Sequence, residues 1–486
     1  MTLKPLAALG IIATLLCSCK GHVHSGSQCL SSLETSTKST TVSTVSGQVA
    51  GYIDDGVYIY KGIPYAKADR FMPPQDPEPW KEVRSSRAYG PTCPQDKRMG
   101  WYSDAQAFAM HWDDGFPDED CLRVNVWTAG INDGAKRPVM VWLHGGGFRA
   151  GSGQELISYD GTNLARDHGV VVVTLNHRLN VLGFLDLSAY GARYAHSGNV
   201  GMLDIVKALE WVRDNIANFG GDPSNVTIFG QSGGGGKVST VMAMPSAKGL
   251  FSKAIVQSGS ITHLLDPKYS RRIGAYTVQT LGVKPSGIDA LASMPYEKLL
   301  AAYNGAIKKV GEEAAQDGNL PSNILDLILF GQVPVVDGEV IPFQPSTPEA
   351  LEISKHVPVI IGTVYNEFTP DKEDEIFRPL ALEQARERTE AGCAPVYLYR
   401  FDWASPVLDG VFGSTHCLEI PFVFDNVMLH RTFTGGGCDA VEFGHRMSRA
   451  WTSFASNGKP EAEGIPEWEV YPAQMNFNIQ SELINN

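Results

Sequence analysis

The feature that most constrains this chain is the run at residues 228–236, Ile-Phe-Gly-Gln-Ser-Gly-Gly-Gly-Gly. The β-branched residues at 226–228 predict a strand, and the glycines predict an abrupt turn into the next element. A serine in a G-x-S-x-G sequence on such a turn is lifted clear of the backbone, because only small neighbours fit inside the turn. The run therefore predicts a strand, a tight turn and a helix that together present Ser232 as a nucleophile.

A second glycine cluster, His144-Gly145-Gly146-Gly147-Phe148, follows the apolar run at residues 138–143. Acyl transfer places negative charge on the carbonyl oxygen of a substrate, and backbone N–H groups directed at that oxygen stabilise it. Glycines let a loop present its amides without a side chain in the way. Either cluster alone would indicate no more than a flexible turn, but two clusters after apolar strands favour catalysis. We predict an oxyanion hole formed by the amides of Gly146, Gly147 and Gly233.

A phosphate-binding loop is the alternative reading of the glycines around Lys237. That loop requires the pattern G-x-x-x-x-G-K-[ST], because its Ser or Thr hydroxyl holds magnesium. Here Lys237 is followed by Val238, and Gln231 stands where the first glycine is required. The pattern fails at two fixed positions, so a nucleotide site of this type is excluded.

Several further motifs follow one another along the chain. They are Tyr-Lys-Gly-Ile-Pro-Tyr-Ala at 60–66, Glu-Asp-Cys-Leu at 119–122, Asn-His-Arg-Leu at 176–179, Gly-Asn-Val-Gly-Met-Leu-Asp at 198–204 and Phe-Gly-Gly-Asp-Pro at 219–223. In this order they resemble the type-B carboxylesterase family, the cholinesterase-like branch of the α/β-hydrolases. The resemblance runs through most of residues 47–486, and it implies one large α/β domain whose mostly parallel central sheet is covered by helices on both faces.

The resemblance also implies the partners of Ser232. The order in this fold is serine, acid, histidine, and the family's acid lies in a Gly-Thr-x-x-x-Glu segment, which here ends at Glu367. Its histidine precedes a Leu-Glu-Ile-Pro-Phe run, which here gives His416. In the implied mechanism His416 takes the proton of Ser232, and Glu367 orients and stabilises the imidazole.

Two departures from the family pattern stand out. Gln231 occupies a position where many relatives carry Glu, so it adds no negative potential beside the serine. The span between Glu367 and His416 is also shorter than is usual for the family, by several tens of residues. We interpret this as an internal deletion in a region that normally helps to wall the substrate gorge.

Composition fits a large globular enzyme with 43% hydrophobic residues among 486. A net charge of −13 argues against nucleic-acid binding, which needs a basic face. Neither H-E-x-x-H nor a C-x-x-C pair occurs, so no metal and no cofactor is expected. Strand-like runs alternate with a helical stretch at 202–218, which predicts a mostly parallel sheet. The expected strands are at 139–143, 170–175, 226–229, 254–257, 357–361 and 396–401.

The N-terminus resembles an export signal. Lys4 precedes an apolar run at 6–16, too short to span a bilayer, and the segment ends in Leu-Cys-Ser-Cys. Residues 1–19 are therefore interpreted as a signal peptide, of the bacterial lipoprotein type if Cys19 is lipidated; ordinary cleavage and secretion is the alternative. The Ser/Thr-rich segment 20–46 is expected to be a flexible tether to a domain spanning 47–486.

The eight cysteines are consistent with export. The family resemblance implies a disulfide between Cys93 and Cys121. The sequence does not pair Cys393, Cys417 and Cys438.

The expected function is that of an exported serine carboxylic ester hydrolase acting on a small-molecule ester through an acyl-enzyme on Ser232. The protein is expected to be secreted, periplasmic or lipid-anchored, with membrane contact only through that anchor. A thioesterase or amidase would use the same triad. A catalytically silent binding protein on the same fold is the other alternative, because of the short span before His416. The sequence predicts no oligomeric state.

Overall fold

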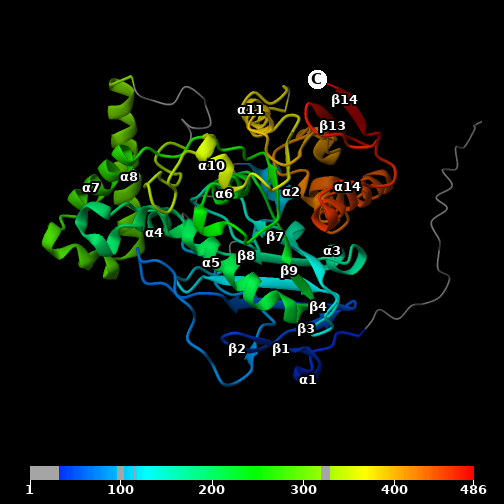
Figure 1. Ribbon diagram of the computed structural model, residues 1–486, viewed down its shortest axis with the longest axis horizontal. Coiled ribbons are helices and arrows are strands. Elements are labelled where there is room, and N and C mark those ends of the chain that lie inside the picture. Colours follow the sequence, from blue (N-terminus) through cyan, green and yellow to red (C-terminus); the bar gives the residue numbers. More distant parts are fainter. Residues whose placement is uncertain (1–31, 96–102, 114, 319–328, 371, 486) are drawn as a thin grey trace, which may run out of the picture.

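An eleven-stranded sheet runs through the molecule, and the helices connect its strands (Figure 1). The computed structural model describes residues 32–95, 103–113, 115–318, 329–370 and 372–485. Within these residues the strand order is β14-β13-β12-β11-β10-β9-β7-β8-β6-β4-β3. The strands are β3 (Tyr52–Asp54), β4 (Val57–Pro64), β6 (Arg123–Thr128), β7 (Arg137–Leu143), β8 (Val171–Leu175), β9 (Gly221–Gln231), β10 (Lys253–Gln257), β11 (Val359–Val364), β12 (Val396–Phe401), β13 (Ala473–Phe477) and β14 (Glu482–Asn485).

Neighbouring strands are parallel from β8 across to β13 and antiparallel only at the two edges. The six strands expected from sequence are β7 to β12, so the predicted mostly parallel sheet is confirmed. The register places Gln257 beside both Gln231 and Gly362. Because parallel strands end at the same edge of a sheet, the loops after β9 and β11 meet there, as binding sites in open α/β sheets do.

The central strands β7 to β12 contribute alternate side chains to two hydrophobic layers, one on each face of the sheet. In β7, Val139 and Val141 belong to one layer, whereas Met140 and Trp142 belong to the other. Buried side chains of α5, α6, α7, α8 and α11 fill the first layer, and those of α3 and α14 fill the second. These helices are α3 (Thr162–Asp167), α5 (Val200–Asn215), α6 (Gly233–Met242), α7 (Pro267–Thr280), α8 (Tyr296–Gln316), α11 (Phe377–Glu390) and α14 (Cys438–Asn457).

Shorter elements complete the described fold. A second sheet, of order β1-β2-β5, lies beside the N-terminal edge of the large sheet (Figure 1). The short elements are β1 (Thr41–Thr44), β2 (Gly47–Ala50), β5 (Arg84–Ser85), α1 (Thr37–Thr40), α2 (Asp104–Met110), α4 (Asn180–Phe184), α10 (Pro348–Ile353), α12 (Ile420–Val423) and α13 (Arg431–Thr434).

The N-terminal boundary differs from the prediction of a tether up to residue 46. Strand β1 pairs antiparallel with β2, and Val42 within it is fully buried. The N–H group of Val45 donates to Asn215 Oδ1 at 2.8 Å, which ties the segment to the end of α5. Thr and Val are β-branched and favour a pleated, half-buried strand, so a composition taken for a tether forms a strand. The signal segment and Cys19 lie outside the described residues.

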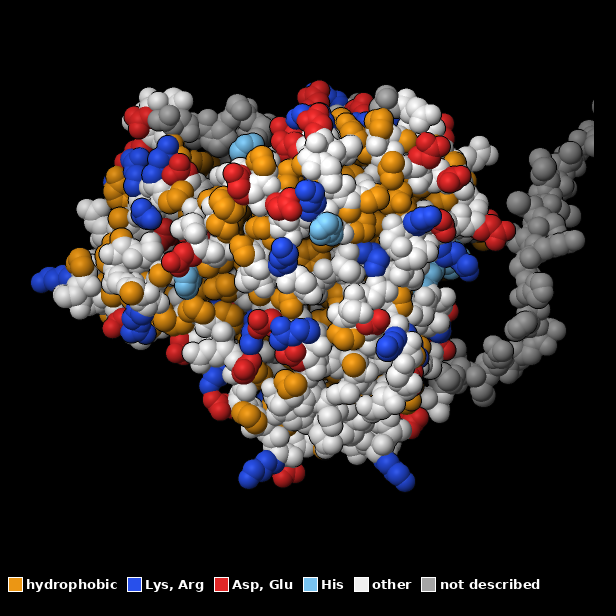
Figure 2. Space-filling model, in the orientation of Figure 1, with side chains coloured by type: hydrophobic (Ala, Val, Ile, Leu, Met, Phe, Trp, Pro, Cys, Tyr) orange, Lys and Arg blue, Asp and Glu red, His pale blue; other side chains and the backbone are white. Residues whose placement is uncertain are grey.

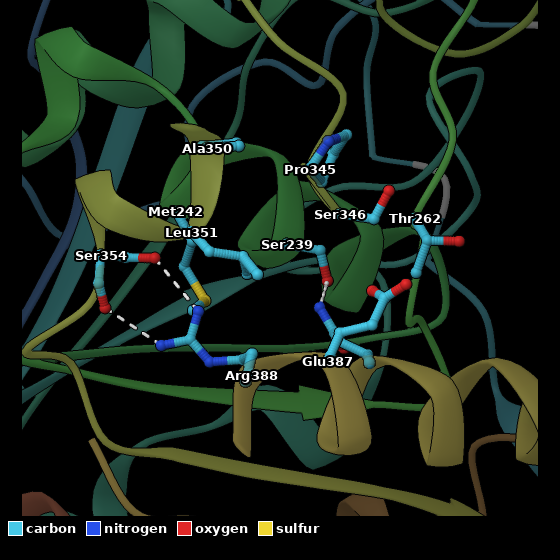
Figure 3. Close-up of a pocket in the computed structure, with 12 residues that line it drawn as sticks. Ser239, Met242, Thr262, Pro345, Ser346, Ala350, Leu351, Ser354, Glu387 and Arg388 are labelled. Atoms are coloured by element: carbon cyan, nitrogen blue, oxygen red, sulfur yellow. Dashed lines mark hydrogen bonds between the residues drawn. The ribbon is translucent and has the colours of Figure 1, made fainter. Parts of the chain in front are cut away.

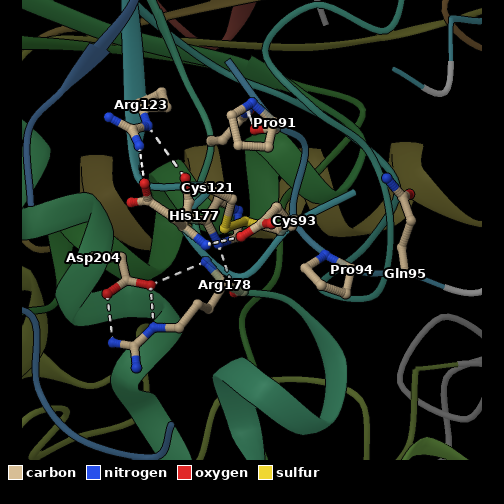
Figure 4. Close-up of a disulfide and its surroundings, with 12 residues drawn as sticks. Pro91, Cys93, Pro94, Gln95, Cys121, Arg123, His177, Arg178 and Asp204 are labelled. Carbon is tan, nitrogen blue, oxygen red and sulfur yellow. Dashed lines mark hydrogen bonds and ion pairs between the residues drawn. A yellow bond between two sulfur atoms is a disulfide. The ribbon is translucent and has the colours of Figure 1, made fainter. Parts of the chain in front are cut away.

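A disulfide joins Cys93 and Cys121, as the resemblance implied, with 5.1 Å between their Cα atoms (Figure 4). Close by, Arg178 forms a buried ion pair with Asp204 of α5, in which Nε and Nη2 donate at 2.8 and 2.7 Å. The remaining nitrogen, Nη1, donates to the carbonyl oxygens of Asp69 and Met72. Through Arg178, α5 is thus connected to the loop at residues 69–72, close to the disulfide.

Figure 2 shows acidic and basic side chains interspersed among hydrophobic side chains over this face of the molecule. No helix in the described part of the chain is both long and apolar enough to cross a bilayer.

Candidate active site

Ser232 stands on the sharp turn between β9 and α6, as predicted. Its backbone has φ 58° and ψ −127°, a conformation that residues with a side chain seldom adopt. The turn is held on both sides, because the N–H group of Ser232 donates to Gln257 O at 2.8 Å and its carbonyl accepts from Gly236 N at 3.0 Å. The side chain is only partly buried. The strand, turn and helix expected from the sequence are therefore present.

The positions after Ser232 require glycine, because the backbone of α6 lies against the backbone at Leu143 and Gly147 with no room for a side chain. A Cβ atom on Gly233 would lie 2.4 Å from backbone atoms of Gly147, and one on Gly234 would lie 1.9 Å from Leu143 O. Any side chain at these positions would separate α6 from the loop that follows β7. The absence of side chains thus brings the two glycine clusters into direct contact.

Three backbone amides at this contact are unpaired. Gly146 and Gly147 have φ values of 79° and 63°, which favour glycine. The N–H groups of these two residues and of Gly233 donate to no acceptor among the described residues. The loop itself is held by hydrogen bonds, including one from Ala150 N to Gly146 O at 3.1 Å. The arrangement offers free donors beside Ser232, as an oxyanion hole requires.

Glu367 and His416 are brought together from positions 49 residues apart. Glu367 lies in the loop after β11, and its Oε2 is hydrogen-bonded to His416 Nδ1. The backbone N–H of His416 also donates to Glu367 O at 3.0 Å. Burial by itself would lower the pKa of His416, but the charge and hydrogen bond of Glu367 outweigh it and raise that pKa above its ordinary value. A proton held on Nδ1 leaves Nε2 as the acceptor needed by a general base.

Gln231 links the serine turn to the histidine. Its Nε2 lies 3.2 Å from His416 Nε2, and its Oε1 accepts from Cys417 Sγ at 3.2 Å. No hydrogen bond between Ser232 and His416 is formed in the described structure. The three predicted triad residues thus share one site: Glu367 and His416 are in contact, and Ser232 adjoins the residue that touches the histidine. Catalytic hydrogen bonds of this kind often tighten only when substrate binds.

Two aromatic residues that the sequence analysis did not select pack against the histidine. The ring centroids of Phe368 and Phe377 lie 4.4 and 5.3 Å from that of His416. Phe368 is 61% exposed, so its ring is available to a substrate. Its position directly after Glu367 was the one signal in the sequence that could have identified it.

The short span between Glu367 and His416 forms ordered structure where it is described. Asp374 accepts hydrogen bonds from the N–H groups of Phe377 and Arg378 at 2.8 and 2.6 Å, which fixes the start of α11. Helix α11 is joined to α6 by a hydrogen bond from Gln384 Nε2 to Ser239 Oγ at 3.1 Å. The span therefore connects Phe368 and Phe377, which lie against His416, to α6, the helix that follows Ser232.

A small cavity lies behind α6, between α10 and α11 (Figure 3). Arg388 crosses it and donates to Ser354 Oγ at 3.2 Å and to Ser354 O at 3.0 Å. Its lining residues come from α6, α10 and α11 and the segments beside them, so the cavity marks where these helices pack together.

A further carboxyl group, that of Glu419, is fully buried near His416. Its Oε1 accepts a hydrogen bond from Gln257 Nε2 at 3.3 Å. Burial, together with the charge of Glu367, raises the pKa of Glu419 to about 7.

In the described part of the chain, no group of three His, Cys, Asp or Glu side chains is arranged to hold a metal ion.

Comparison with known proteins shows to which family the chain is similar. The model of the Carboxylesterase family matches residues 38–388 and 372–483. Para-nitrobenzyl esterase of Bacillus subtilis (strain 168) is 36% identical, over 88% of this chain and 92% of that protein. Phenmedipham hydrolase of Pseudarthrobacter oxydans is 32% identical, over 88% and 92% of the two chains. A solved esterase from Clostridium hathewayi, which can hydrolyze aliphatic aromatic polyesters, has a TM-score of 0.81 at 34% identity and covers 91% of this chain and 95% of its own.

The aligned chains also differ in length. The alignment with the Bacillus subtilis enzyme is 479 residues long, yet it uses 88% of a chain of 486, so the relative contains residues that this chain lacks. The two matched segments of the family model meet at 372–388, inside the short span. The chain belongs to the type-B carboxylesterase family, the serine-type carboxylic ester hydrolases with the α/β-hydrolase fold.

Proposed function

We propose that this protein hydrolyses small-molecule carboxylic esters through an acyl-enzyme on Ser232. His416 removes the hydroxyl proton as Ser232 Oγ attacks the ester carbonyl, and the negative oxygen is held by the amides of Gly146, Gly147 and Gly233. His416 then passes the proton to the leaving alcohol, and a water molecule repeats the sequence to release the acid. The observation that carries the proposal is the contact between Glu367 and His416 beside a serine on a strained turn.

The substrate is proposed to contain an aromatic part. The exposed ring of Phe368 lies against His416 and is backed by the buried ring of Phe377. Offset or edge contacts between aromatic rings stabilise binding beyond the area they bury. The names of the relatives are in keeping with this, since they include a para-nitrobenzyl esterase and an enzyme that hydrolyzes aliphatic aromatic polyesters.

Export is proposed on two grounds. The segment at 1–19 resembles a secretory signal, with Cys19 as the residue that would carry lipid. The disulfide between Cys93 and Cys121 suits an oxidising compartment. Fractionation of producing cells, with and without a Cys19→Ala substitution, tests the proposal: a lipid-anchored protein would move from the membrane fraction to the soluble exported fraction.

Kinetics on a p-nitrophenyl ester of a short-chain acid test the proposed reaction. Replacement of Ser232 by Ala should lower kcat by about 10⁶-fold, because the nucleophile and base act as one unit. Circular dichroism should show the same fold in both proteins. A folded wild-type protein without turnover on alkyl and aryl esters would contradict the proposal and favour a binding role.

A further inference from the structure

Lys237 is a fully buried lysine in α6, one turn after the serine elbow. Lysine is almost never fully buried unless its charge is paired, because removing an ammonium group from water costs several kcal/mol. The proposed hydrolysis makes no use of this side chain. Its partners therefore indicate what it does.

Within the described part of the chain, the ammonium group of Lys237 donates two hydrogen bonds, and both go to the first glycine cluster. Lys237 Nζ donates to His144 O at 2.7 Å and to Gly145 O at 3.3 Å. The ring of Phe148, at the other end of that cluster, lies 5.9 Å from the same nitrogen. The lysine thus connects α6, which supplies the amide of Gly233, to the loop that supplies the amides of Gly146 and Gly147.

Peptide geometry relates these carbonyls to the free amides. The C=O group of Gly145 and the N–H group of Gly146 belong to one planar trans peptide unit, in which they point in opposite directions. When Lys237 holds the Gly145 oxygen, the Gly146 N–H group of the same peptide unit must point away from Lys237. His144 Nδ1 also lies 3.0 Å from this Gly145 oxygen, so the imidazole and the lysine together hold a peptide unit that its glycines would otherwise leave free to rotate.

Among the described residues, no carboxylate forms a direct ion pair with the ammonium group of Lys237. His144 and His177 are stacked with 5.0 Å between their rings, and burial followed by the charge of Lys237 lowers the pKa of each well below its ordinary value. Both rings are therefore neutral. Burial lowers the pKa of Lys237 to about 7, and Glu155 is the carboxylate whose charge opposes that shift. The hydrogen bonds to the loop are thus the main direct contacts of this group.

We propose that Lys237 is a positioning residue of the oxyanion hole, which acts by holding the carbonyl groups of His144 and Gly145. This inference rests on the proposed function, since it assigns a role within the same site. Lys237 touches no substrate atom in this account. It affects the rate through the direction in which the loop amides point.

Replacement of Lys237 by Met removes the donors while it keeps most of the side-chain volume. We expect kcat to fall by roughly 10- to 100-fold, because loss of one complete oxyanion donor costs about 100- to 1000-fold and misdirection should cost less. KM should stay within about twofold of the wild-type value, because the loop acts on the tetrahedral state rather than on the bound ester. The affinity for an aryl trifluoromethyl ketone, which forms a tetrahedral adduct on serine, should fall by the same factor as kcat/KM.

Lys253 provides the matched control. It is also a buried lysine, but at the start of β10, where its ammonium group is bonded to Asn225 and Ser252. The Lys253→Met variant should keep wild-type kcat and inhibitor affinity. A Lys237→Gln variant, which retains a neutral N–H donor, should recover part of the activity lost in Lys237→Met.

The outcomes separate this inference from the function on which it rests. Wild-type turnover that Ser232→Ala abolishes establishes the hydrolase, whatever Lys237 does. A folded Lys237→Met variant with wild-type kcat and inhibitor affinity would overturn the positioning role. An unfolded Lys237→Met variant beside a folded Lys237→Gln variant with wild-type kinetics would assign Lys237 to stability and overturn it as well.

Discussion

His416 is the residue whose surroundings decide the chemistry of this site. It is held by Glu367 through both a side-chain and a backbone hydrogen bond, and it lies against two aromatic rings. The contact between Glu367 and His416 could be predicted, because the segments that carry these two residues are distinctive in sequence. The contacts of Phe377 and Lys237 could not, because each joins segments that only the folded chain brings together.

Replacement of Glu367 by Gln should lower kcat by about 10³- to 10⁴-fold, because the neutral amide no longer fixes the tautomer of His416 or stabilises the imidazolium. Steady-state kinetics on a p-nitrophenyl ester measure this loss. Conservation of wild-type kcat in a correctly folded Gln variant would remove Glu367 from the triad.

The pH profile gives a separate test of the same contact. His416 acts as a base only when unprotonated, so kcat/KM should rise with pH through its pKa, and this rise should centre above the ordinary value of 6.5. In the residual activity of Glu367→Gln the rise should move to lower pH, because the raising charge is gone. Glu419 is a weaker cause of the raised pKa, so Glu419→Gln should move the rise less. Identical profiles in all three proteins would show that these carboxylates do not act on the general base.

At the scale of elements, the strands were predictable because each is a compact apolar run, and the serine elbow was predictable because its glycines leave few alternatives. Strand β1 was missed because its Ser and Thr residues resemble a linker in composition. Its pairing partner β2 and the buried position of Val42 become visible only in the folded chain.

The disulfide is expected to stabilise the loop between β4 and β6. It joins residues 28 apart, so substitution of Cys93 and Cys121 by Ser should lower the free energy of unfolding by about 3–4 kcal/mol on the loop-entropy model. Urea unfolding monitored by circular dichroism measures the change. Cys438→Ser is the control, since Cys438 is a free and exposed thiol. Equal stability of the double variant and the wild type would mean that the bridge adds nothing to the fold.

At the scale of the whole molecule, the family resemblance predicted the architecture correctly, and the main error concerned where the folded domain begins. The structure starts pairing before residue 47, through β1 and the contact of Val45 with Asn215. The shortened span before His416 also keeps its place in the sheet, since β12 still pairs with β11 and β13.

A chain that begins at residue 47 should therefore be less stable than one that begins at residue 32. Loss of the buried Val42 side chain alone should cost about 1.5–3 kcal/mol, and the unpaired edge of β2 adds to that loss. Thermal unfolding of the two proteins measures the difference. Equal Tm values would restore the interpretation of this segment as a tether.

The central claim, that catalysis passes through a covalent intermediate on Ser232, is tested most directly by mass spectrometry after treatment with diethyl p-nitrophenyl phosphate. This reagent phosphorylates an activated serine and releases p-nitrophenol. We predict one diethylphosphoryl group per chain, located on the peptide that contains Ser232, with activity lost in proportion to labelling. Full inactivation with the label on another residue, or hydrolysis that continues when Ser232 is fully labelled, would contradict the account.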